Sequence, residues 1–305
     1  MNQKEKKEQK LMRHKIWEYM RQNKRMAILY LVLRVLVVAT LILQIFNQQY
    51  ENVYLCVLTL VLLMIPSFIE INFHIDIPDT LEVVILFFIM AAEILGEIQQ
   101  FYIRFSNWDT ILHTLNGFLA AAIGFSLVDL LNRNDRFKFE LSPVFLAIVS
   151  FCFSMTIGVL WEFFEWSMDW FFGFDMQKDT VIHSISSMML VTDGSNLPAR
   201  IDDIQTVIVN GTELGLGGYL DIGLMDTMED LFVNFIGAVI FSIIGYFYVR
   251  SKGKGRFARR FIPRRIPKEV LDDIKKEVQE EVESSEELGA VSTVETDLNA
   301  DPASS

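Results

Sequence analysis

The sequence contains only two cysteines in 305 residues, Cys56 and Cys152, and both lie inside apolar runs. This placement excludes a disulfide framework and a cysteine ligand set for zinc, and it predicts two buried apolar side chains. The sequence also has no glycine-rich phosphate loop, no HExxH motif and no GxSxG motif. The common nucleotide-binding, zinc-protease and serine-hydrolase sites are therefore excluded.

Basic residues are scarce in the longest polar stretch, 173–225, and concentrated elsewhere. They cluster in residues 1–25, in "NRNDRFKFELS" and in "RSKGKGRFARR", whereas the tail after Pro267 is acidic. Because cytoplasmic loops of membrane proteins are enriched in Lys and Arg, we expect these three basic segments to be cytoplasmic. The net charge of −12 averages segments in different surroundings and indicates no nucleic-acid partner.

Half of the residues are apolar, and they are gathered into runs of the length that a membrane-spanning helix requires, about 20 residues. Six runs meet or approach this length: roughly 26–46, 53–69, 81–99, 109–131, 143–172 and 227–249. The first follows a basic start and has no small-residue cleavage site, which is typical of an uncleaved signal anchor. We therefore expect an all-α membrane protein, a six-transmembrane-helix bundle in the plasma membrane with both termini in the cytoplasm.

This topology divides the chain into a basic segment (1–25), a transmembrane domain (26–250) and a cytoplasmic tail (251–305). The tail is basic and then acidic, partly helical by its apolar spacing, and we expect its end to be disordered. The segment 173–225 faces outside, where two β-favouring runs around Asn210-Gly211 predict a β-hairpin insertion. The weakest point is "EINFHIDIPD", which must be cytoplasmic by alternation although it has no basic residue.

Four of the predicted spans carry polar side chains on one helical face, since residues three, four and seven apart share a face. The residues are Glu93 and Glu97; Asp109, His113 and Asn116; Glu162, Glu165 and Asp169; and Asp226, Asp230 and Asn234. In the fourth span this face also carries the small residues Gly117, Ala120 and Gly124, which permit close helix packing. Alternation of the spans places all four stripes at the outer side, level with a belt of tryptophans.

Each stripe also has a simpler interpretation. Acids at helix ends are often solvated interface residues, Arg104 is a candidate ion-pair partner for Glu93 and Glu97, and His113 alone is typical of a hydrogen-bonded packing residue. The convergence of the stripes favours function, because several adjacent carboxylates cannot all stay ionised without cations or protons. Oxygen-rich ligands with a single imidazole suit Mg²⁺, Ca²⁺ or Mn²⁺ better than Zn²⁺. The expected metal ligands are Asp109, His113, Glu162, Glu165, Asp226 and Asp230, beside the polar residues Glu93, Glu97, Asn116, Asp169 and Asn234.

The motifs "GEIQQFY", "WDTILHTLNGF", "WEFFEW" and "DTMEDLFVNFIGA" resemble, in this order, those of the YjdF-like multi-pass bacterial membrane proteins and, more distantly, of the VanZ-like proteins. The resemblance covers about 65–250, and Glu165 stands where the VanZ-like pattern usually has glutamine. It implies a bacterial envelope protein but little biochemistry, although one branch of these relatives is associated with glycopeptide-antibiotic tolerance.

Two function classes follow from this pattern. One is a site in the outer leaflet that holds a divalent cation and binds or acts on a lipid or envelope headgroup. The other is a non-enzymatic membrane protein, such as a proton- or cation-coupled transporter or an envelope organiser. The sequence does not decide between an enzyme and a binding protein; it predicts membrane lipids as partners and identifies no protein partner.

Overall fold

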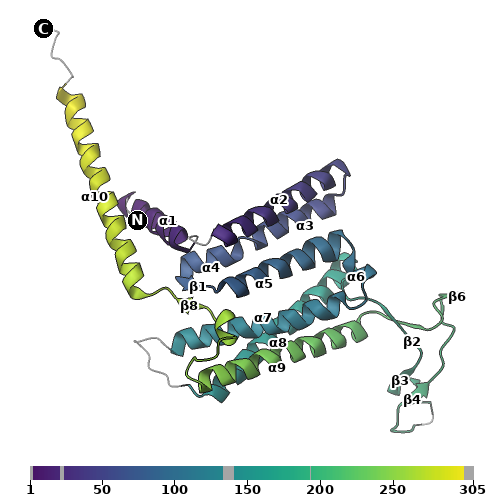
Figure 1. Cartoon of the computed structure of the whole chain (residues 1–305). Coiled ribbons are helices and arrows are strands. Elements are labelled where there is room, and N and C mark those ends of the chain that lie inside the picture. Colours follow the sequence, from purple (N-terminus) through teal and green to yellow (C-terminus); the bar gives the residue numbers. More distant parts are fainter. Residues whose placement is uncertain (1–2, 21–23, 133–140, 193, 299–305) are drawn as a thin grey trace. The chain divides into compact units, whose positions relative to one another are not determined.

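The structure, a computed structural model, describes residues 3–20, 24–132, 141–192 and 194–298 (Figure 1). Its elements separate into two compact units, which are described in turn. The first comprises Met1–Arg104, Leu130–Lys138 and Gly253–Ser305; the second comprises Phe105–Asp129 and Phe139–Lys252.

Among the residues that the structure describes, five helices are long and apolar enough to cross a membrane, which confirms a mostly helical membrane protein. They are α2 (Lys24–Phe46), α3 with α4 (Tyr50–Phe73), α7 (Trp108–Asn132), α8 (Pro143–Phe172) and α9 (Leu224–Arg250). The third of the six predicted spans, 81–99, is not among the five. It corresponds to α5 (Asp79–Ile89) followed by a π-helix, η1 (Met90–Ile98), and three glutamates lower its apolar character: Glu82, Glu93 and Glu97.

The core of the first unit is formed by α2, α3, α5 and η1. Tyr30, Val37, Cys56 and Leu86 are buried there, and the Tyr30 hydroxyl donates a 2.6 Å hydrogen bond to Glu82 Oε1. Cys56 is therefore buried as expected. The prediction for Cys152 is wrong, because its side chain is exposed on the apolar surface of α8. Lipid contact satisfies an apolar side chain as well as burial does, so the sequence pattern does not distinguish the two.

The two ends of the chain pack against each other within the first unit (Figure 1). Ile16 of α1 (Gln3–Met20) is fully buried together with Ile274 and Val278 of α10 (Lys268–Leu298). Lys15 Nζ lies 3.2 Å from Glu277 Oε2 and 3.7 Å from a carboxylate oxygen of Glu281. The basic start of the chain and its acidic tail thus form one helix pair. The residues expected to be disordered at the very end, beyond 298, lie outside the described residues.

The connection after α4 (Ile65–Phe73) is also joined to the C-terminal segment. Strand β1 (Ile75–Asp76) pairs antiparallel with β8 (Arg264–Arg265), and Ile266 N donates to His74 O at 3.0 Å. The connection that has no basic residue of its own therefore lies against two arginines of the basic C-terminal segment.

In the second unit, α7, α8 and α9 pack at very short range. Ser154 Oγ of α8 donates to Gly117 O of α7 at 2.7 Å. A Cβ atom at Gly117 would overlap the backbone carbonyl of Asn234 on α9, and one at Gly237 would overlap that of Thr114. The small-residue face predicted for α7 thus packs against α9 at Gly117, where glycine is required because backbone meets backbone, and against Phe153 of α8 at Gly124.

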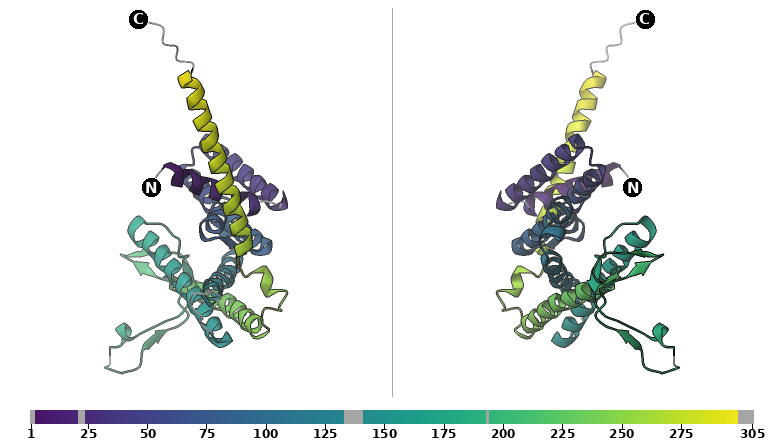
Figure 2. Two further views of the ribbon diagram at one scale, coloured as in Figure 1. Left: turned by 90° about the vertical axis from the view of Figure 1, so that its left-hand side faces the viewer. Right: turned by 90° about the vertical axis from the view of Figure 1, so that its right-hand side faces the viewer.

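The loop between α8 and α9 carries short antiparallel strand pairs beyond the helix ends (Figure 2). The pairs are β2 (Thr180–Ile182) with β7 (Tyr219–Asp221), β3 (Ile185–Ser187) with β4 (Ala199–Ile201), and β5 (Ile208–Val209) with β6 (Thr212–Glu213). The hairpin predicted at Asn210-Gly211 is confirmed: both turn residues have positive φ, 53° and 83°, as a type I′ turn requires. Residues 133–140 of the basic connection between α7 and α8 lie outside the described residues.

Candidate functional site

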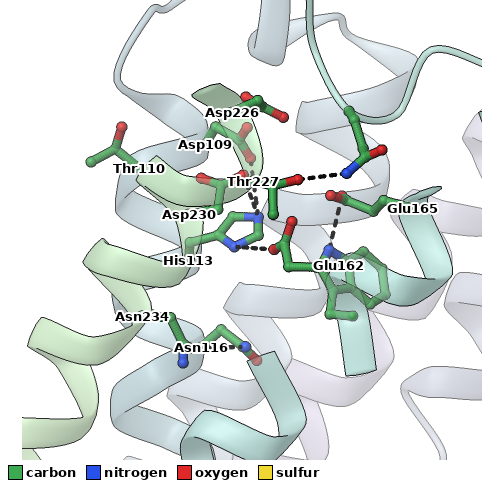
Figure 3. A network of polar contacts seen from close by, with 12 residues as sticks. Asp109, Thr110, His113, Asn116, Glu162, Glu165, Asp226, Thr227, Asp230 and Asn234 are labelled. Carbon is green, nitrogen blue, oxygen red and sulfur yellow. Dashed lines mark hydrogen bonds and ion pairs between the residues drawn. The ribbon is translucent and has the colours of Figure 1, made fainter. Parts of the chain in front are cut away.

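The polar side chains of α7, α8 and α9 meet at the helix ends that adjoin the strand-bearing loop (Figure 3). His113 lies among them. Its Nε2 is 3.5 Å from Asp109 Oδ1 and 3.5 Å from Asp230 Oδ2, and its Nδ1 is 3.8 Å from Glu162 Oε1. One imidazole therefore contacts carboxylates from all three helices.

A second group of three carboxylates shares a residue with the first. Glu162, Glu165 and Asp230 each offer an oxygen, and these oxygens lie within 4.8 Å of one another, as do ligand atoms of Asp109, His113 and Asp230. The three carboxylates of this second group are buried, with 4%, 7% and 3% of the residue exposed. One oxygen of each has no hydrogen-bond partner among the described residues: Glu162 Oε2, Glu165 Oε2 and Asp230 Oδ2, the last of which lies 3.5 Å from His113 Nε2. We call the five residues of the two groups the carboxylate–histidine cluster.

Helical spacing and close packing together form this cluster. Asp109 and His113 are one turn apart on α7, and Glu162 and Glu165 are three residues apart on α8, so each pair points the same way. The glycine contact of α7 with α9 then brings Asp230 to His113. Larger residues at Gly117 or Gly237 would separate the two helices and with them the ligands.

A short strap, residues 176–178, ties the loop to all three helices. Asp169 of α8 accepts hydrogen bonds from Met176 N at 2.6 Å and Gln177 N at 2.8 Å. Asp226 of α9 accepts from Lys178 N at 2.9 Å. Asp226 was expected among the metal ligands and Asp169 among the neighbouring polar residues. Both accept hydrogen bonds from the strap, neither belongs to the two groups of three, and the ligand role of Asp226 stays a prediction.

Lys178 is a site residue that the sequence reasoning missed. Its Nζ lies 2.6 Å from Asp109 Oδ2, next to the carboxylate–histidine cluster. Burial lowers the pKa of this amine, but the attraction of Asp109 and Asp226 outweighs burial and raises the pKa above its ordinary value. Lys178 therefore stays protonated. One signal was available: Lys178 is the only lysine and Arg200 the only arginine in 173–225.

One turn farther from the strap, Asn116 of α7 donates to Asn234 Oδ1 of α9 at 3.3 Å, and Asn234 Nδ2 lies 3.7 Å from Met155 Sδ. Beyond this pair the interior becomes aromatic. Phe118 and Phe241 meet edge to face at 5.0 Å between ring centroids, and Phe125 lies 6.0 Å from Phe241. Toward the middle of the helices, aromatic packing and serine-to-backbone hydrogen bonds, such as that of Ser150 Oγ to Ala121 O at 2.7 Å, thus replace the ionisable side chains.

Glu93 and Glu97 were expected to join the same polar layer. They lie on η1 in the first unit, where Glu93 is half-buried and Glu97 is exposed. Their membership in the layer stays a prediction.

Several carboxylates this close repel one another unless cations or protons offset their charge. Buried carboxylate oxygens and an imidazole supply the ligand types of a hard divalent cation. The carboxylate–histidine cluster can therefore hold a divalent cation or share protons.

Apolar helices of spanning length define the chain as a multi-pass membrane protein. A family model for predicted membrane proteins, DUF2238, matches residues 28–251, and the chain belongs to this family. The match agrees with the resemblance to YjdF-like membrane proteins. No curated protein and no solved structure matches the chain.

Proposed function

We propose that this protein is a multi-pass protein of the bacterial plasma membrane that binds a divalent cation in the carboxylate–histidine cluster and, through it, a lipid or envelope headgroup. One observation carries the proposal. Glu162, Glu165 and Asp230 are more than nine-tenths buried, and each keeps a carboxylate oxygen without a hydrogen-bond partner among the described residues. Buried polar atoms are rarely left unpaired, and a cation bound among these three residues, whose ligand oxygens lie within 4.8 Å of one another, would supply a partner.

The ligand chemistry favours Mg²⁺, Ca²⁺ or Mn²⁺ over Zn²⁺. Four carboxylates and one imidazole make a donor set rich in oxygen, which hard cations prefer. Lys178 offsets only one of these negative charges, so a divalent ion still has a large electrostatic incentive to bind. An ion held by protein on one side keeps coordination positions for an anionic headgroup on the other.

The interior packing favours binding at one end of the helices over the alternatives, a cation-coupled transporter or an envelope organiser. A transporter usually places its site near the midplane, with access from both sides. Here the edge-to-face contacts of Phe118, Phe125 and Phe241 lie on the far side of the Asn116–Asn234 pair.

The count of six crossings is also part of this proposal. Strands β1 and β8 are hydrogen-bonded, so the chain must cross the membrane an even number of times between Asp76 and Arg264. Only three of the five apolar helices, α7, α8 and α9, lie between them. The helical segment Asp79–Ile98, made of α5 and η1, supplies the fourth crossing and brings the total to six.

Cysteine labelling tests this topology in a variant that lacks Cys56 and Cys152. A thiol introduced at Ser195, in the strand-bearing loop, should react with an impermeant maleimide on intact cells. A thiol at Ser251, just after α9, should react only after permeabilisation. Labelling of both positions on intact cells would remove the outer-leaflet location from the proposal.

Metal removal tests the binding function. Adding the bound cation at about 100 times its dissociation constant should stabilise the purified protein by about 2.7 kcal/mol, measured as a rise in Tm, and a chelator should reverse the rise. Mg²⁺, Ca²⁺ and Mn²⁺ are titrated separately, with Na⁺ at equal ionic strength as the control. A Tm that none of the three ions moves would contradict cation binding.

A further inference from the structure

A groove lies beside the carboxylate–histidine cluster in the second unit. It has a volume of about 250 Å³ and is lined by Asn116 of α7 and by Ile157, Leu160 and Trp161 of α8. The three α8 residues are 36%, 55% and 43% exposed. Because α8 is long and apolar enough to span a membrane, these exposed side chains face lipid.

The groove is continuous with the cluster through two of its residues. The indole N–H of Trp161 donates to Glu165 Oε1 at 2.9 Å, and Asn116 donates to Asn234, one helical turn from His113 (Figure 3). Trp161 thus contacts the groove with its ring and the carboxylates with its nitrogen. An aromatic residue with a polar tip suits such a boundary between apolar and polar surroundings.

Along the helices, the polar cluster is followed by the apolar groove, just as a lipid headgroup is followed by its hydrocarbon chains along the bilayer normal. Ile157 lies four residues from Trp161, which is about 6 Å at the rise of an α-helix, on the side away from the strap. The polar cluster is therefore at the helix ends, and the apolar groove runs from it toward the helix middle. A lipid with its headgroup at the cluster has its chain in the groove.

We propose that the protein binds a phosphate-bearing membrane lipid. Its headgroup lies at the carboxylate–histidine cluster, and its hydrocarbon chain lies in the groove formed by Asn116, Ile157, Leu160 and Trp161. This inference rests on the proposed cation function, because the phosphate binds to the ion that offsets the carboxylates. The hydrocarbon chain of a lipid suits the groove, because the groove walls are mostly apolar and open to the hydrocarbon region of the bilayer. The inference adds a chain-binding subsite, and it makes Trp161 a positioning residue between chain and headgroup.

Photolabelling tests the subsite. The full chain is reconstituted in phosphatidylglycerol vesicles that contain a small fraction of phosphatidylglycerol with a diazirine in one acyl chain, and labelled residues are mapped by mass spectrometry. In the native protein, residues 157–161 should be labelled more strongly than residues 144–148, which form another lipid-facing stretch of α8. The substitution Ile157→Trp fills the groove and should reduce labelling of Leu160 and Trp161 about tenfold, the change expected when burial of one aliphatic group is lost.

The matched control is Ile148→Trp, the same change at another exposed position of α8, where 54% of the isoleucine is exposed. It should leave the labelling of Leu160 and Trp161 unchanged. Labelling that is even along α8, or equal effects of the two substitutions, would overturn the chain subsite. A diacylglycerol with the same photoreactive chain but no phosphate should label the groove several-fold less, and equal labelling would overturn the phosphate preference.

The cation content of the same samples separates the two proposals. The Ile157→Trp variant should lose the labelling of the groove and keep its bound cation. That result supports both the cation function and the lipid-chain subsite. An ion without preferential labelling of the groove overturns the chain subsite alone. Preferential labelling without an ion overturns the cation function and leaves a lipid groove whose headgroup is bound in another way.

Discussion

Substitution of Gly117 by alanine is expected to destabilise the protein by about 3 kcal/mol, the upper end of the usual cost of inserting a methyl group into packed space. The new Cβ would overlap the backbone carbonyl oxygen of Asn234, and a backbone cannot rotate away as a side chain can. Helix α9 would have to move from α7, and Asp230 would move with it from His113. The fall in stability is measured by thermal or denaturant unfolding in detergent.

Gly245→Ala on α9 is the matched control. Its Cβ would meet the ring atoms Cδ2 and Cε2 of Phe125 at 2.8 Å, and a side-chain ring can shift where a backbone carbonyl cannot. Since alanine is favoured over glycine in a helix by about 1 kcal/mol, the net change should stay within about 1 kcal/mol of the native chain. Equal losses for the two variants would contradict the requirement for backbone contact at Gly117.

Much of the candidate site could be predicted because it depends on the spacing of residues within single helices. Asp109 and His113, or Glu162 and Glu165, share a helical face by spacing alone, and the polar faces of α7, α8 and α9 meet at His113. The glycine face of α7 was readable for the same reason, and so was the turn at Asn210-Gly211, where both residues tolerate positive φ.

The rest depended on contacts between distant residues. Lys178 reaches Asp109 across 69 positions, and the hydrogen bonds of the strap with Asp169, Asp226 and Thr227 fix that path. The pairing of β1 with β8 joins two-residue strands that are too short to give a periodic signal. The exposure of Cys152 could not be read either, because lipid-facing and buried positions of a spanning helix are both apolar.

Asp230→Asn is expected to weaken cation binding at least about 100-fold, because even residues that only support a metal ligand often cost 10–100-fold when changed. Asp230 is the one residue common to the two groups of three. The amide keeps the shape of the side chain but removes its charge and one ligand oxygen. The dissociation constant is measured by calorimetric titration of the purified chain.

Glu229→Gln is the matched control for this variant. It removes one negative charge from the neighbouring residue of α9, which is exposed and belongs to neither group of three. Its dissociation constant should stay within a few-fold of the native value. If Glu229→Gln weakened binding as much as Asp230→Asn, the effect would be general electrostatics rather than coordination.

The metal content of the purified native chain tests the central claim most directly. We expect one Mg²⁺, Ca²⁺ or Mn²⁺ per chain by elemental mass spectrometry after equilibration with that ion and removal of the excess, and none in Asp230→Asn prepared in the same way. A native chain that retains no ion under these conditions, with the stability of a chelator-treated sample unchanged, would mean that the buried carboxylates hold protons. That result would contradict the cation-binding function.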